Sequence, residues 1–341
     1  MNKKLFLLDC TLRDGGYVNE WKFDNTMAVN IIEGLYQAGV DIIECGIMGK
    51  CSTPGKTTIF SSFTEIEPLL QNRKKDYLYA VMLNFTEKDN FVIPEYSEKT
   101  VDCIRVAFFK NEWENAIKYG VSLKDKGYKV FLQAMATYMY SESELLQLID
   151  VINRIMPESF YFVDSFGTLY NDDVLKIAGL IDKNLHPEIL LGFHAHNNIQ
   201  MAFSNTISFF QMPTARKKVI TDSSIFGMGR GAGNVTTELI MNYLNTRHNA
   251  DYKIENVLEL FDKYFRKIFE QYFWGYTLEY YLTAIKDINS AYGWYYQQKG
   301  VSNLKELNSI LEKIPNEQKY TLVRKIADEA LSAVKQGNHD G

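Results

Sequence analysis

Residues 128–164, YKVFLQAMATYMYSESELLQLIDVINRIMPESFYFVD, contain the pattern that decides the fold. A short run rich in β-branched and aromatic residues stands at each end, and between them residues 142–155 carry apolar side chains at helical spacing. Ser141 followed by Glu144 has the spacing of a capping box, which predicts a helix start. A strand, a helix and a strand of these lengths predict one parallel βαβ unit.

The same alternation extends outward from this unit in both directions. The candidate strands are 4–9, 41–47, 77–83, 102–108, 128–135, 159–164, 189–195 and 218–226. A further predicted helix, 25–38, has Asn25 as its N-cap and Gly39 just past its end. Eight strands alternating with helices over about 240 residues fit an open doubly wound sheet or a closed barrel, and their number and span favour the α/β class with a (β/α)8 TIM barrel.

The strand pattern stops near residue 250, and the remaining chain is rich in Leu, Glu, Lys and Tyr at helical spacing. This change predicts a C-terminal α-helical extension. We therefore expect a TIM-barrel catalytic domain over residues 1–248 and a helical extension over residues 249–341.

Composition and charge exclude several classes of protein. The 341 residues include 37 Lys and Arg against 42 Asp and Glu, a net charge of −5 that argues against a nucleic-acid partner. No uncharged stretch approaches the roughly 18–20 residues that span a bilayer, and Asp9 ends the N-terminal apolar run too early for a signal peptide. The four cysteines form no CxxC pair and indicate buried thiols in a reducing compartment. We expect a cytoplasmic protein with no membrane partner.

The active site of such a barrel lies at the C-terminal ends of its strands. His194 and His196 end the seventh candidate strand, where residues two apart point to the same face. An isolated HxH is equally well explained as two hydrogen-bonded polar residues, but Asp14, after the first strand, can complete a ligand set. Two histidines and one carboxylate with open positions suit Mn²⁺, Mg²⁺, Fe²⁺ or Zn²⁺.

Other side chains at this end of the barrel have alternative roles. Arg13 is expected either to pair with Glu44 or Asp9, as buried arginines usually pair, or to stabilise an oxyanion beside a metal, and both roles are compatible. The glycine run 227–233 comes last in the alternation, so it is a weak dinucleotide motif. Asn234 after it either caps the next helix or reaches the metal.

Four stretches together resemble the DRE-TIM metallolyase superfamily, which includes HMG-CoA lyase, 2-isopropylmalate synthase and 4-hydroxy-2-oxovalerate aldolase. They are 9–15 (DCTLRDG), 43–46 (IECG), 192–197 (GFHAHN) and 227–234 (GMGRGAGN). They occur in the order of the superfamily, and the sequence is most similar to the 4-hydroxy-2-oxovalerate aldolase-like proteins. The tail more weakly resembles the helical extension of these aldolases.

The resemblance implies a role for each matching residue. Asp14, His194 and His196 would bind a divalent metal, with Asn234 as a further ligand or a neighbour of the ligands. Mn²⁺ is the first expectation, with Mg²⁺, Co²⁺ or Zn²⁺ as alternatives. Arg13 would stabilise an enolate, and Glu44 would hold Arg13.

The proton-transfer group is where this sequence departs from the aldolases. Those enzymes carry a histidine three places after the metal aspartate, and here that place is Tyr17. Tyr292 lies in an Ala-Tyr-Gly segment that resembles the tail tyrosine of the aldolases. We expect Tyr17, or failing that Tyr292, to be a base whose phenol a nearby positive charge makes more acidic, with a metal-bound water as the remaining alternative. The loop 227–234 lacks the cysteine of the lyase branch, which argues against an HMG-CoA lyase mechanism.

The expected function is therefore a divalent-metal-dependent aldolase, a carbon–carbon lyase acting on a 4-hydroxy-2-oxo acid through a pyruvate-like enolate. The alternatives are an acyl-CoA-dependent Claisen-type synthase and a non-catalytic metal-binding barrel. A small 2-oxo acid is the expected substrate, and the sequence is compatible with a homo-oligomer. The aldolases it resembles can pass their aldehyde to a partner dehydrogenase, for which this sequence offers no support.

Overall fold

The computed structural model describes residues 4–216 and 218–337. Its strands form one parallel sheet in the order β1-β9-β8-β7-β6-β5-β4-β2-β3, and pairing of β1 with β2 closes the sheet. The barrel strands are β1 Lys4–Asp9, β2 Ile42–Met48, β4 Leu78–Asn84, β5 Cys103–Phe108, β6 Lys129–Ala134, β7 Ser159–Asp164, β8 Leu190–Ala195 and β9 Lys218–Ser223. The closed ring of eight parallel strands confirms the (β/α)8 barrel.

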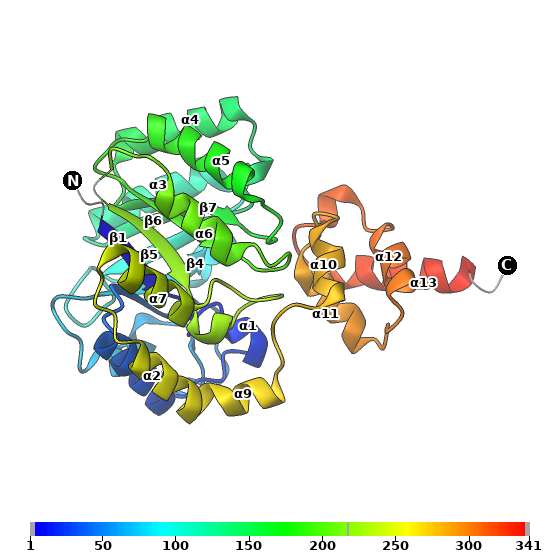
Figure 1. Cartoon of the computed structure of the whole chain (residues 1–341), viewed down its shortest axis with the longest axis horizontal. Helices are drawn as coiled ribbons and strands as arrows, with labels where there is room; N and C mark the ends of the chain where they lie inside the picture. Colours follow the sequence, from blue (N-terminus) through cyan, green and yellow to red (C-terminus); the bar gives the residue numbers. More distant parts are fainter. Residues whose placement is uncertain (1–3, 217, 338–341) are drawn as a thin grey trace.

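Helices cover the outside of the ring (Figure 1). They are α2 Asn25–Gln37, α3 Trp113–Asp125, α4 Glu142–Ile155, α5 Asn171–Asn184, α6 Ala202–Gln211, α7 Thr237–His248, α8 Ile254–Leu260 and α9 Arg266–Gln271, whereas the short α1 Gly16–Asn19 lies in the loop after β1. The capping box of Ser141 and Glu144 is present at α4. The N-cap expected at Asn25 is wrong, because the carboxylate of Asp24 accepts the backbone N–H of Met27 instead.

The alternation is irregular after the second strand. Residues between β2 and β4 contain the two-residue strand β3, Ile59–Phe60, which pairs with β2, and short 3-10 turns in place of a long helix. A strand of two residues shows no period-2 pattern, so sequence patterning missed it.

The lower interior of the barrel is filled by inward-facing apolar side chains. They include Leu8, Cys10, Ile42, Ala80, Cys103, Phe131, Tyr161, Val163 and Ile220. Gly192 makes room for the Tyr161 ring, since a Cβ at residue 192 would overlap it. Because this layer closes the interior, polar residues further along the same strands are held at the C-terminal mouth of the barrel.

The chain beyond α9 forms the predicted helical extension, which Figure 1 shows beside the barrel. Its helices are α10 Leu278–Ala284, α11 Ser290–Gln298, α12 Leu304–Leu311 and α13 Arg324–Gly337. It has its own apolar core, which includes Ile288 and Leu311. The Tyr320 ring stacks on Phe166 at 6.1 Å between centroids, and a Cβ at Gly231 would meet Ser290. The extension therefore contacts loops at the mouth.

The predicted division at residue 248 stays a prediction. Apolar residues of α8 and the following turns, among them Val257, Phe265 and Trp274, belong to the core of the barrel. The outer limits, residues 1–3 and 338–341, lie outside the described residues. No helix in the described parts of the chain combines the length and apolar character of a bilayer-spanning segment.

Candidate metal and catalytic site

Three predicted ligands converge at the mouth. Asp14 lies in the loop after β1, His194 lies on β8, and His196 follows the end of that strand. One potential ligand atom from each residue lies within 4.8 Å of the other two, and all three residues are buried. The two imidazole rings are perpendicular, with centroids 4.9 Å apart. The structure thus places side by side the residues that the motifs predicted as ligands.

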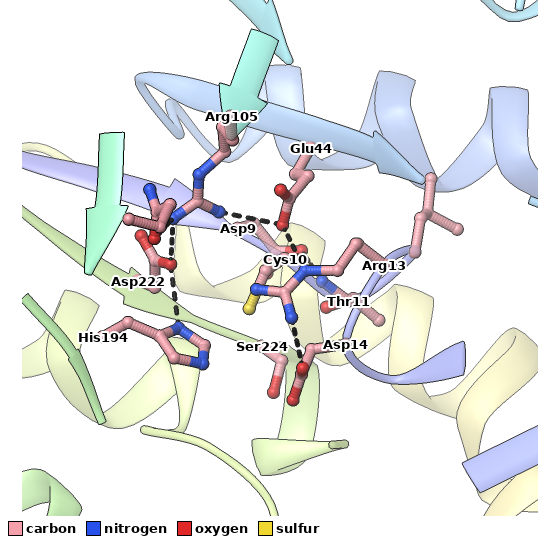
Figure 2. Close-up of polar contacts among 12 residues, drawn as sticks. Asp9, Cys10, Thr11, Arg13, Asp14, Glu44, Arg105, His194, Asp222 and Ser224 are labelled. Atoms are coloured by element: carbon pink, nitrogen blue, oxygen red, sulfur yellow. Dashed lines mark hydrogen bonds and ion pairs between the residues drawn. The ribbon is translucent and has the colours of Figure 1, made fainter. Parts of the chain in front are cut away.

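Asp222 fixes the orientation of His194. Its Oδ2 lies 2.8 Å from Nδ1 of His194, which leaves Nε2 with a lone pair for a cation (Figure 2). A carboxylate behind a ligating histidine is a frequent feature of metal sites, because it sets both the ring orientation and the tautomer. Asp222 was missed in the sequence, although it lies two residues after Ile220 and therefore on the inward face of β9.

His196 carries a buried polar atom without a partner. Its Nδ1 has no hydrogen bond and lies 3.9 Å from Oδ2 of Asp14. Burial lowers the pKa of His196 well below its usual value, so the imidazole is neutral and its lone pair is available. Buried polar atoms are nearly always satisfied, and a cation between His196 and Asp14 would satisfy this one.

A chain of ion pairs crosses the barrel beneath the ligands. Arg13 pairs with Asp14 and, through Nε at 2.8 Å, with Glu44. Arg105 pairs with the same Glu44 oxygen at 2.9 Å and with Asp222 (Figure 2). Three carboxylates and two guanidiniums sum to −1, a charge that favours a bound cation. Arg13 is thus held by Glu44, as predicted, and not by Asp9.

The ion pairs keep the ligand carboxylate charged. Burial alone would raise the pKa of Asp14, but the charge of the neighbouring Arg13 lowers it well below its usual range. Burial also opposes ionisation of Asp222, and Arg105 with His194 reverses that effect, so its pKa is lowered too. Both carboxylates are therefore ionised at neutral pH.

Asn234 lies beside the predicted ligands and does not cap the next helix. The N-cap of α7 is Thr236. The amide Nδ2 of Asn234 donates to Oδ2 of Asp14 at 2.9 Å and to the carbonyl of Met228 at 3.2 Å, while Oδ1 is buried without a partner. Asn234 thus orients Asp14 and, after His196 Nδ1, presents a second unsatisfied polar atom close to the ligands.

The glycines of the loop after β9 allow it to approach the ligands. A Cβ at Gly229 would lie 2.7 Å from Oδ2 of Asp14 and would overlap the amide of Asn234. Gly233 has φ +87°, and a Cβ there would overlap the carbonyl of Gly227. This packing supports a role for the loop in closing the site rather than in binding a dinucleotide.

Tyr17 lies at the mouth, on α1. The guanidinium of Arg230 lies 5.5 Å from the centroid of its ring, and Trp21 packs edge-on against it at 4.5 Å. Tyr17 is 41% exposed. Loss of water around its phenol raises the pKa of Tyr17, and the charge of Arg230 offsets this only in part. The direction is opposite to the acidic phenol that we expected.

Tyr292 does not lie among the mouth residues, so its predicted role as an alternative base needs correction. The residue is buried in the core of the extension. Its hydroxyl donates to the carbonyl of Gln318 at 2.8 Å and accepts the backbone N–H of Val323 at 3.2 Å. A hydroxyl committed to the backbone on both sides holds the turn before α13.

Ile47, Met82 and Ala107, near the ends of β2, β4 and β5, form an apolar cluster at the mouth.

Cys10 and Cys45 lie close to the mouth but are not suited to act as nucleophiles, because burial raises the pKa of both thiols.

A barrel with this ligand cluster at its C-terminal mouth belongs to the class of metal-assisted barrel enzymes. The chain is a member of the HMGL-like family, which it matches over residues 4–262. This membership confirms the predicted superfamily.

Individual relatives agree with that membership. The chain is 28% identical over 276 residues to the 4-hydroxy-2-oxovalerate aldolase of Pseudoalteromonas translucida, covering 75% of each protein. It is 24% identical over 264 residues to the oxaloacetate decarboxylase of Mycobacterium tuberculosis, covering 76% of this chain and 75% of the relative. The N-terminal domain of a candidate aldolase from Bacteroides vulgatus has the same fold, with a TM-score of 0.72, 28% identity, and coverage of 86% of this chain and 96% of that structure.

Proposed function

We propose that this protein is a divalent-metal-dependent aldolase that cleaves or forms a 4-hydroxy-2-oxo acid. The observation that carries the proposal is the convergence of Asp14, His194 and His196 beside a buried, carboxylate-held Arg13. The names of the relatives support the reaction class, since an aldolase and a decarboxylase of 2-oxo acids both release a pyruvate-like enolate.

Asp14, His194 and His196 would hold the metal, with Asn234 orienting Asp14. The unsatisfied Nδ1 of His196 and the charge of −1 over the ion-pair chain support this fit. A bound divalent cation supplies a Lewis acid for the 2-oxo acid group. Mixed nitrogen and oxygen donors suit Mn²⁺, the metal we propose, with Mg²⁺, Co²⁺ or Zn²⁺ as the alternatives.

Arg13 would stabilise the enolate. In cleavage the C4 hydroxyl loses its proton, the C3–C4 bond breaks, C4 becomes the aldehyde carbon, and the bonding pair passes to C3 of the enolate. Protonation of C3 then gives the 2-oxo acid. Arg13 lies against Asp14 and is fixed by Glu44, so its charge is in place before the negative charge develops.

Tyr17 is the residue we propose for proton transfer at the C4 oxygen. Its raised pKa suits a neutral phenol that donates this proton in the direction of bond formation. In cleavage the same group must accept the proton, so the phenolate is the active form. Its place three residues after Asp14 keeps it at the mouth.

Further parts of this proposal concern the whole protein. The packing of α8 and α9 supports a boundary after Trp274, between the barrel and the helical extension. The four cysteines are free thiols, in line with a cytoplasmic location. A homo-oligomer and a partner dehydrogenase stay predictions.

Metal-loaded protein tests the function directly. We expect pyruvate release from racemic 4-hydroxy-2-oxovalerate that needs added Mn²⁺ and disappears with a chelator. Release of the CoA thiol from acetyl-CoA with a 2-oxo acid, without aldol cleavage, would instead indicate the Claisen-type synthase. Stoichiometric metal binding with neither reaction would indicate a non-catalytic barrel.

A further inference from the structure

Arg230 is the one charged residue in the loop 227–234, which follows β9 at the mouth. Its backbone N–H faces Oδ2 of Asp14 at 3.3 Å. One guanidinium nitrogen donates to the carbonyl of Ser165 at 3.1 Å, and the guanidinium rests over the ring of Tyr17. These contacts hold the side chain close to the proposed metal ligands.

The pairing of Arg230 differs from that of the other two arginines at the mouth. Arg13 and Arg105 each pair with two carboxylates. No carboxylate of the described residues lies within 4.0 Å of the Arg230 guanidinium, although the residue is half-buried. A guanidinium has five N–H donors, and the bond to Ser165 uses one, so the others can receive an anion from solution.

The charge at the mouth fits two carboxylates on one ligand. The ion-pair chain sums to −1, so a divalent metal changes the total to +1, which balances a single substrate carboxylate. Arg230 adds one more positive charge, beside Tyr17 and Ser165.

The loop fixes where this charge is presented. The side-chain oxygen of Asn198 accepts the backbone N–H of Ala232 at 2.7 Å, and its amide donates to the carbonyl of Phe166 at 2.8 Å. Gly231, beside Arg230, has φ +64° and lies so close to Asn198 that a Cβ would overlap it. Arg230 therefore extends from a braced loop.

We propose that Arg230 binds a second carboxylate of the substrate, carried by the aldehyde half of the molecule. This inference rests on the proposed aldolase function. The bond changes are those already given, and the released aldehyde is itself an acid. Arg230 selects 4-hydroxy-2-oxo diacids over monoacids that have an alkyl group at the same carbon.

The test compares 4-hydroxy-2-oxoglutarate with 4-hydroxy-2-oxovalerate, in which a methyl group replaces the second carboxylate. With Mn²⁺, wild-type kcat/KM should favour the diacid. Arg230→Gln should lower the ratio of kcat/KM for the diacid to kcat/KM for the monoacid by about 30-fold, as expected for a lost charge-assisted pair. Any effect of the lost charge on the neighbouring Tyr17 acts on both substrates alike and cancels in this ratio. Arg230→Lys should lie between wild type and Arg230→Gln. Arg154→Gln removes an exposed guanidinium on α4, paired with Asp150, and should not change the ratio.

A binding experiment separates this inference from the proposed function. Calorimetry with 2-oxoglutarate and 2-oxovalerate, which lack the 4-hydroxyl group and cannot undergo this cleavage, should show tighter binding of the diacid to wild type and no preference in Arg230→Gln. If no substrate is cleaved but this preference is found, the aldolase proposal fails and the Arg230 site stands. Equal effects of Arg230→Gln on both ligands, or a wild-type protein without preference, would overturn the assignment.

Discussion

The barrel mouth and the helical extension both bury polar side chains, but the two regions differ in whether these side chains have hydrogen-bond partners. At the mouth, His196 Nδ1, Asn234 Oδ1 and Asp222 Oδ1 are buried without hydrogen-bond partners. In the extension, Tyr292 and Tyr296 donate to the backbone carbonyls of Gln318 and Ala327, and over residues 275–337 no buried side-chain nitrogen or oxygen is left unsatisfied. Unsatisfied atoms on His196 and Asn234, both of which approach Asp14, indicate a ligand, whereas the satisfied hydroxyls of the extension indicate a folded core.

The strongest test of this contrast removes a ligand. Asp14→Ala should abolish stoichiometric metal binding and lower turnover by about 1,000-fold or more, because the Lewis acid contributes several kcal/mol. His194→Ala should do the same, and both variants should stay folded, since these side chains lie at the mouth. Metal analysis and circular dichroism check this. Full metal content in both folded variants would contradict the ligand assignment.

Replacing the enolate-stabilising group should have the next largest effect. Arg13→Lys keeps the charge but loses the planar fork that Asp14 and Glu44 hold. Turnover should fall about 100-fold or more, as for a lost oxyanion donor, with metal content unchanged. Steady-state kinetics at saturating metal measures this loss of turnover. Unchanged turnover would show that Arg13 has only a structural role.

Tyr17→Phe separates a catalytic hydroxyl from a wall of the pocket. Cleavage should slow by up to about 100-fold while metal content stays the same. Since the pKa of Tyr17 is raised and the phenolate is the active form in cleavage, the wild-type rate should increase from pH 7 to pH 9. The Phe variant should lose that increase. If Tyr17→Phe keeps the wild-type pH profile, Tyr17 is not the base, and the role would pass to a water molecule.

Asp222→Asn tests the carboxylate that orients the proposed metal ligand His194, and leaves the ligand itself unchanged. Weaker orientation of His194 should lower metal affinity by about 10- to 100-fold. Asp102→Asn is the matched control, because it breaks the pair with Arg73 at 2.5 Å, which lies outside the chain of mouth ion pairs. Competition with a fluorescent chelator measures both affinities, and equal losses would show that general destabilisation is the cause.

The smallest expected effect is in the extension. Tyr292→Phe loses hydrogen bonds to the backbone and should lower the free energy of unfolding by about 1 kcal/mol, with turnover unchanged. Chemical denaturation and the pyruvate assay measure the two properties. A large loss of turnover with normal stability would show that Tyr292 takes part in catalysis. The extension would then contribute to the active site and would not be a purely structural region.

Periodicity along single strands was enough to predict much of the site. His194 and His196 are two residues apart, and the barrel rule brings the distant Asp14 to the same mouth, so all three residues were predicted to lie together. The pairing of Arg105 with both Glu44 and Asp222 was not predictable in this way. It depends on which inward side chains of β2, β5 and β9 meet across a closed interior.

The error over Tyr292 has a related cause. Apolar and aromatic residues at helical spacing in the extension predict that the aromatic side chains are buried. This spacing does not predict which surface they pack against. The hydroxyl partners of Tyr292 come from the turn before α13, residues 318–323, and only the packed structure shows this. Tyr17, in contrast, is tied to Asp14 by three residues of chain, which limits where it can lie.

The proposed ligands lie at the ends of the two strands that flank β9, the last strand of the ring in the sequence. Asp14 follows β1, His194 lies on β8 and His196 just after it, and β9 lies between these strands and pairs with both. A nascent chain therefore has no complete ligand set until nearly the whole ring has been synthesised and joined. A metal bound by these residues would connect the two strands that flank β9. At a free metal concentration of 100 times Kd, binding would raise the free energy of unfolding of the closed barrel by about 2.7 kcal/mol. Metal uptake would then report completion of the ring during folding.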